Sequence, residues 1–112
     1  MRKGGQVMEQ PNLKSLVREV AQLAWRYKKA QVQVLMYQPT MDMQEKQLHH
    51  DNVKFIEAFQ YMLNHMAEEC RQIILNDFIN HQDHQWWLHF YARSTYYRIK
   101  GRALKELLKF LK

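Results

Sequence analysis

Residues 93–112, RSTYYRIKGRALKELLKFLK, predict a single amphipathic helix. Apolar side chains recur three and four residues apart, as one face of a helix requires. They are Tyr96, Ile99, Ala103, Leu107 and Phe110 or Leu111. Seven Lys and Arg residues stand against the single acid Glu106, which leaves this segment with a net charge of +6. We therefore expect one buried side and one basic, exposed side.

The segment before it predicts a second helix, over residues 67–80. Glu68 and Glu69 fall in its first turn, where acids suit the positive end of the helix dipole. Its inward stripe is expected to consist of Cys70, Ile73, Ile74, Asp77 and Phe78.

Between these two helices the apolar pattern is interrupted at residues 80–84. Asp83 is a suitable N-cap for a short apolar helix that starts near Trp86 and Trp87. Neighbouring side chains on a helix point in different directions. One tryptophan is therefore expected in the core and the other partly exposed.

The N-terminal half predicts one long helix over residues 13–37, with Asn12 as N-cap and Pro39 beyond its end. Its apolar side chains follow a heptad pattern: Leu13, Val20, Tyr27 and Val34, with Leu16, Leu23 and Ala30 three positions after the first three. Such a stripe is typical of a core helix in a small bundle, and the alternative is a homodimeric coiled coil.

Two polar segments border the predicted helices. Residues 1–11 contain two adjacent glycines and are expected to form a flexible tail. Residues 40–50, TMDMQEKQLHH, are expected to be a linker or a weak turn of helix, followed by a helix over 52–65 that Asp51 or Asn52 caps.

The expected fold class is all-α: a long N-terminal helix packed with a small helical bundle that ends in a helix-turn-helix. A length of 112 residues suits one domain, spanning 12–112 and divided into the long helix 12–38 and a helical unit 51–112. Only three glycines and two prolines interrupt the chain, and no segment alternates as a strand would.

Composition excludes several classes. The single cysteine rules out an internal disulfide and favours a reducing, cytoplasmic setting. The start of the chain lacks the apolar core of a signal peptide, and no run is long enough to span a membrane. There is no phosphate-binding glycine loop or activated nucleophile, so no enzyme, cofactor or catalytic residue is expected. His81, His84 and His89 lack the further ligands of a zinc site, so no metal is expected either.

One stretch, residues 68–111, resembles a known family. The matching pieces are the run ECRQII at 69–74, Phe78, and RSTYYR at 93–98 with Lys100 and RAL at 102–104. These resemble the region-4 domain of sigma factors and the related phage late-gene regulators of the ArpU type. The resemblance implies a bacterial or phage transcription regulator that binds double-stranded DNA through a recognition helix and contacts RNA polymerase.

The recognition helix implied by this resemblance begins at Arg93 or Ser94. An arginine in the first turn can bind guanine with two hydrogen bonds, and Ser or Thr can bind a base or a phosphate. The expected DNA-binding residues are Arg93, Ser94, Thr95, Tyr97 and Arg98, with Lys100, Arg102 and Lys105 on phosphates.

Ala92, Trp86 and Phe90 depart from the family pattern, which has Ser and small residues there, so a wider turn is expected before the recognition helix.

Two other functions fit the same residues. A lysine- and arginine-rich C-terminal helix can be a solvated amphipathic face, or it can bind RNA without sequence preference. The rival of a different class is a non-enzymatic helical adaptor that dimerises or docks through helix 13–37 and meets an acidic surface. The charge distribution suits a polyanionic partner at one end, since residues 31–92 carry a net charge of −5.

Overall fold

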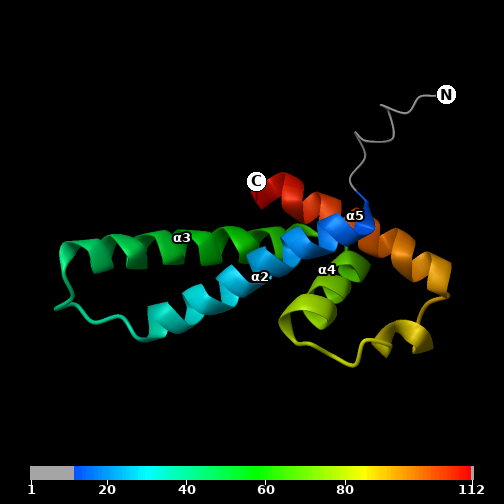
Figure 1. Ribbon diagram of the computed structural model, residues 1–112, viewed down its shortest axis with the longest axis horizontal. Helices are drawn as coiled ribbons and strands as arrows, with labels where there is room; N and C mark the ends of the chain where they lie inside the picture. Colours follow the sequence, from blue (N-terminus) through cyan, green and yellow to red (C-terminus); the bar gives the residue numbers. More distant parts are fainter. Residues whose placement is uncertain (1–11, 112) are drawn as a thin grey trace.

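The computed structural model describes residues 12–111, and every regular element in that range is a helix (Figure 1). In chain order these are α2 (Leu13–Leu35), α3 (Met43–His65), α4 (Glu68–Ile74), the π-helix η1 (Leu75–Ile79), the 3-10 turn η2 (Trp86–His89) and α5 (Arg93–Leu111). The all-α prediction is confirmed. The tail predicted at residues 1–11 lies outside the described residues.

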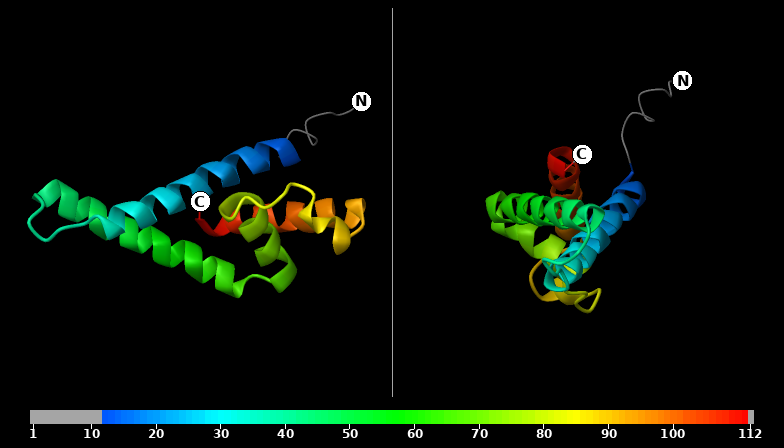
Figure 2. Two further views of the ribbon diagram at one scale, coloured as in Figure 1. Left: turned by 90° about the horizontal axis from the view of Figure 1, so that it is seen from below. Right: turned by 90° about the vertical axis from the view of Figure 1, so that its left-hand side faces the viewer.

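The long helix α2 and its neighbour α3 form an antiparallel hairpin (Figure 2). Asn12 caps α2 as predicted, since its side-chain oxygen accepts the backbone N–H of Ser15 at 2.7 Å. The first half of α2 also packs against α5 and η1. Its second half reaches with α3 beyond the rest of the molecule.

The linker predicted at residues 40–50 is wrong, because α3 already begins at Met43. Asp42 accepts the backbone N–H of Glu45 at 2.9 Å, and the Glu45 carboxylate accepts the backbone N–H of Asp42 in return. This reciprocal pair is a capping box, and its Asp-x-x-Glu spacing is visible in the sequence. The first half of α3 is exposed to solvent, and its polar composition led to the prediction of a linker. Asp51 and Asn52 lie inside α3, so neither of them caps it.

The helix predicted at 67–80 is confirmed in position, but its last turn is wound as the π-helix η1. In η1 the backbone N–H of Asn80 donates to the carbonyl of Leu75, five residues earlier, at 2.7 Å. The predicted inward stripe is also confirmed. Cys70, Ile73, Ile74 and Phe78 are buried, and the Asp77 side chain is only 10% exposed.

One core joins these elements. Val20 of α2, Phe59 of α3, Ile73 of α4 and Leu107 of α5 are completely buried in a single apolar cluster. The ring of Tyr27 stacks on that of Phe59, with 4.3 Å between the centroids. Phe110 lies outside this cluster and is exposed, so of the two alternatives for the end of the α5 stripe, Leu111 is the one that packs against the core.

The heptad stripe of α2 faces this core. Leu16, Val20, Tyr27 and Ala30 are each 6% exposed or less. They are therefore unavailable to a second copy of the chain, and the core-helix alternative is the one that the structure bears out. A coiled coil through this stripe is not compatible with the fold.

No helix within residues 12–111 is long and apolar enough to cross a membrane.

The capping box at Asp42 yields a stability prediction. We expect Asp42→Ala to lower the free energy of unfolding by about 1 kcal/mol, because the backbone N–H of Glu45 loses its acceptor. Urea unfolding followed by circular dichroism measures this loss. Asp42→Ser retains a side-chain oxygen and should unfold near the wild-type midpoint. An Asp42→Ala protein as stable as wild type would contradict the assigned cap.

Candidate nucleic-acid interface

Helix α5 has two chemically different faces, as predicted. Tyr96, Ile99, Ala103 and Leu107 are buried, and Leu104 and Leu108 extend this buried side. The opposite side is exposed and carries Ser94, Arg98, Arg102, Lys105 and Lys109. The helix begins at Arg93, directly after Ala92, whose carbonyl accepts the backbone N–H of Tyr96 at 2.9 Å.

Most residues predicted to read base edges are open to solvent. Arg93, Ser94 and Arg98 are exposed, Tyr97 is 40% exposed, and Thr95 is half-buried. The Arg93 guanidinium lies 5.8 Å from the centroid of the Tyr97 ring. In Figure 1 this first part of α5 extends beyond α2 and α4.

Beneath that surface, Asp77 of η1 binds three residues of the two elements beside it, η2 and α5. Its carboxylate accepts the indole N–H of Trp86 at 2.7 Å and the hydroxyl of Tyr96, and it lies 3.1 Å from Lys100 Nζ. The Asp77 and Lys100 side chains are only 10% and 14% exposed. Burial, and next the hydrogen bond to Asp77, raises the pKa of Tyr96 well above its usual range. The hydroxyl therefore stays protonated and donates.

Lys100, one of the three predicted phosphate contacts, belongs to this buried network. Its ammonium group lies 3.1 Å from Asp77 Oδ2 and donates to the Tyr96 hydroxyl at 3.2 Å. Burial of a carboxylate requires a nearby cation, and Lys100 fulfils that need. From its spacing along α5, Lys100 lies at the border of the basic face. Its side chain is directed inward because it pairs with Asp77.

Arg102 is half-exposed and bridges two helices. It donates to Glu69 of α4 at 2.7 Å and to the Cys70 sulfur at 3.5 Å. Its guanidinium is thus held in place at the edge of the basic face. Cys70 itself is buried, and burial raises the pKa of its thiol, so it remains a protonated core side chain.

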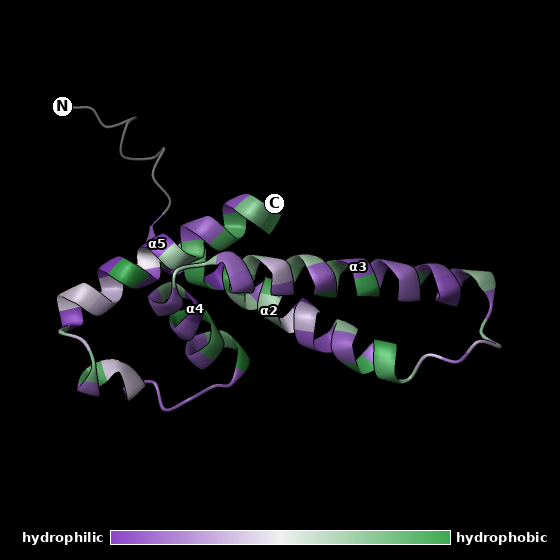
Figure 3. Ribbon diagram, turned by 180° about the vertical axis from the view of Figure 1, so that it is seen from behind, coloured by the Kyte–Doolittle hydropathy of each residue, from purple (hydrophilic) through white to green (hydrophobic). Residues whose placement is uncertain are grey.

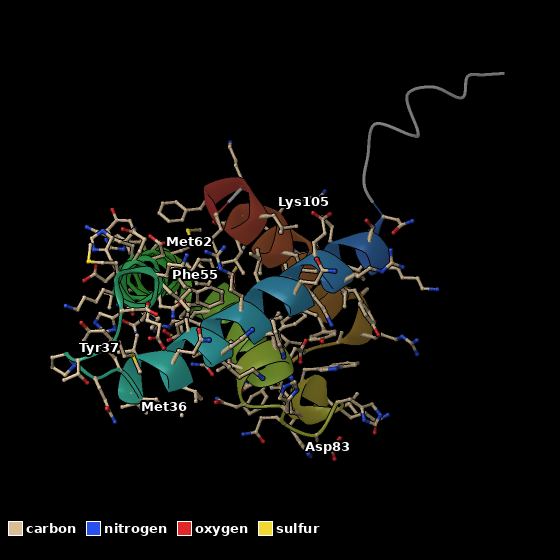
Figure 4. The ribbon with its side chains drawn as sticks, turned by 60° about the vertical axis from the view of Figure 1, so that its left-hand side comes forward. Met36, Tyr37, Phe55, Met62, Asp83 and Lys105 are labelled. Atoms are coloured by element: carbon tan, nitrogen blue, oxygen red, sulfur yellow. The ribbon has the colours of Figure 1, made fainter. Side chains whose placement is uncertain are left out.

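Lys105 is exposed on the outer side of α5, on the same side of the molecule as the start of α2 (Figure 4). Of the three predicted phosphate contacts, Lys105 is open to solvent, Arg102 is shared with Glu69, and Lys100 is enclosed.

The connection between η1 and α5 contains η2, a single 3-10 turn, where a short helix was predicted. The prediction that Asp83 is its N-cap is wrong, because Gln85 is the residue directly before η2, and Asp83 accepts the backbone N–H of Gln85 at 3.0 Å. Residues 90–92 then separate η2 from α5, a length that suits the turn of a helix-turn-helix. The first arm is only four residues long, so the helix-turn-helix ending stays a prediction.

The two tryptophans behave as predicted. Trp87 is buried and stacks on Tyr96 with 4.3 Å between the ring centroids, and Trp86 is half-buried at the Asp77 network. Phe90 points outward and is 71% exposed. The turn accommodates Trp86 and Phe90, because the Trp86 indole binds Asp77 and the Phe90 side chain is exposed to solvent instead of lying between η2 and α5.

The histidines of the connecting loop lie beside a hollow of about 380 Å³ that Asp77, Tyr97 and Lys100 also line. His81 has a left-handed backbone conformation, with φ of 49°, and its ring is 2.7 Å from Lys28 Nζ of α2. Within residues 12–111 no three His, Cys, Asp or Glu side chains come together as a metal site would require.

No protein-family model, no curated protein and no solved structure matches this chain.

The Asp77 network yields the second prediction. We expect Asp77→Ala to lower the free energy of unfolding by about 3 kcal/mol, because it leaves the Lys100 ammonium buried without its carboxylate. Denaturant unfolding measures this effect. Glu57→Ala, at an exposed carboxylate of α3, is the control and should change the value by less than about 0.5 kcal/mol.

Replacing Lys100 in the Asp77→Ala protein tests the cause. The double variant Asp77→Ala with Lys100→Met removes the unpaired charge and should recover part of the lost stability. A double variant less stable than Asp77→Ala alone would show that the unpaired charge of Lys100 is not what destabilises the Asp77→Ala protein.

Proposed function

We propose that this chain is a sequence-specific DNA-binding protein that places the first turns of α5 in the major groove. The observation that carries the proposal is the division of α5. Arg93, Ser94 and Arg98 are open to solvent, whereas Tyr96 and Ile99 anchor the same turns in the core. A recognition helix needs its N-terminal residues free to reach base edges while its other side is held rigidly.

Electrostatics supports the same conclusion. The exposed face of α5 is basic, and Asp77 and Glu69, two acids that contact this helix, are already paired with Lys100 and Arg102. The remaining positive charge is available to the phosphates of a duplex.

The resemblance of residues 68–111 to sigma region-4 domains supports a more specific role. On this proposal the chain is a bacterial or phage transcription regulator of the cytoplasm that contacts RNA polymerase and has no enzymatic activity. The helix-turn-helix of that family would here consist of η2, residues 90–92 and α5.

The third prediction concerns affinity for DNA. We expect Arg98→Ala to weaken binding of a labelled duplex about tenfold at low salt, since it removes a phosphate or base contact. Arg93→Ala should weaken binding similarly and also reduce the preference for one sequence over another. Fluorescence polarisation titrations at several salt concentrations measure both effects.

Lys46→Ala is the matched control, because Lys46 is an exposed cation of α3 in the first turn after the α2–α3 loop. It should bind as wild type does. A wild-type protein that binds no duplex at low salt would overturn the proposed function.

A second candidate, a protein–protein adaptor, is favoured by the outer face of α2. Trp25, Val32 and Met36 are 62%, 54% and 66% exposed, and their spacing of seven and four places them along one line of the helix. Figure 3 shows that the end of α2 next to the α2–α3 loop is hydrophobic. Arg18 and Lys29 lie on the same line, so the complementary partner is an acidic surface with apolar side chains.

Arg93→Ala separates the two candidates, because it changes α5 and leaves the outer face of α2 intact. Duplex binding should fall in this variant if DNA binding is the function. An adaptor would instead show Arg93-independent, weak binding to any polyanion.

A further inference from the structure

A shallow groove of about 450 Å³ lies between the start of α2 and the exposed face of α5. Leu13 and Leu16 of α2 form one wall. The other wall comes from successive turns of α5, namely Tyr97, Arg98, Gly101 and Lys105. The groove thus continues directly from the residues proposed to read bases, and a second helix takes part in it.

The chemistry of the groove combines an apolar floor with cationic rims. Leu16 is buried and Leu13 half-buried, whereas Arg98 and Lys105 are exposed and Arg102 lies beside them, oriented by Glu69. Among residues 12–111, none of those that line the groove is acidic. An elongated anion with apolar parts, such as a sugar–phosphate strand, fits such a surface better than a neutral or cationic ligand does.

Gly101 lies at the middle of the groove, inside a regular helix. A Cβ built on it would meet no heavy atom within 4 Å apart from its own helix and chain neighbours, so neither packing nor backbone conformation requires a glycine there. Glycine nevertheless destabilises the interior of a helix relative to alanine. An open glycine between Arg98 and Lys105 is therefore a place where another backbone can approach α5 closely.

We infer that this groove seats the sugar–phosphate backbone of one strand of duplex DNA, passing over Gly101 between α2 and α5. The inference rests on the proposed function and extends it. The first turn of α2 becomes part of the DNA interface, and the strand is fixed by Arg98 and Lys105 while Arg93 and Ser94 reach the bases.

Two substitutions at Gly101 test the inference in the full chain. Gly101→Trp fills the groove and should weaken binding of a labelled duplex of about two helical turns at least tenfold. Gly101→Ala adds only a Cβ in open space. It should raise the melting temperature by about 5 °C and weaken duplex binding about threefold, far less than Gly101→Trp does, because its Cβ enters the space where the strand approaches α5.

A charge pair on the other wall provides a test that does not depend on Gly101. Leu13→Glu and Leu13→Lys lose the same apolar contacts but carry opposite charges beside the groove. Leu13→Glu should weaken binding about fivefold, and Leu13→Lys should steepen the salt dependence by about one phosphate contact. Glu at a helix start is stabilising and Lys destabilising, so stability and affinity should change in opposite directions.

The possible failures are distinguishable. If wild type binds and Arg93→Ala weakens it, but Gly101→Trp and Leu13→Glu bind as wild type does, the groove inference is wrong and the proposed function stands. If wild type binds no duplex at low salt, both are wrong. If a single strand binds more tightly than the duplex and Gly101→Trp removes that binding, the duplex assignment is overturned.

Discussion

The structure depends on one buried carboxylate. Asp77 lies where η1, η2 and α5 meet, and it binds Trp86, Tyr96 and Lys100 at once. Its partners come from two other elements, Trp86 from η2 and both Tyr96 and Lys100 from α5, so satisfying this one anion sets the path of the connecting loop and the rotation of α5. A charge buried to this extent is stable only with such partners, and the rotation of α5 that provides them also turns Arg93 and Arg98 outward.

Helix α2 has one side in the core and another side exposed to solvent. Most of its heptad side chains are buried against α3, α5 and η1, whereas Trp25, Val32 and Met36 remain on its outer side. Its first turn also borders the basic face of α5. In Figure 4 Met36 and Tyr37 lie at the far end of the hairpin from Lys105, so the apolar and the cationic surfaces are well separated. They can therefore serve different partners.

Much of the fold was predictable because helices are local structures. The caps at Asn12 and the stripes of residues 13–37, 67–80 and 93–112 follow from spacing alone, and each appears in the structure. The start of α3 was also encoded locally, in Asp42 and Glu45, but the polar composition around them was misread as a linker. The candidate site was predicted less completely, since the sequence did not reveal that Lys100 pairs with Asp77.

The sequence by itself determined that this chain is helical, where most helices lie, and that its last helix is apolar on one side and basic on the other, because these properties depend on residues three and four apart. Only the tertiary structure decided which cations remain free. Lys100 and Arg102 meet Asp77 and Glu69, which lie more than twenty residues earlier in the chain, and no local spacing reports such a contact. The same holds for the groove at Gly101, because its two walls, at Leu13 and Lys105, approach each other only when α2 crosses α5.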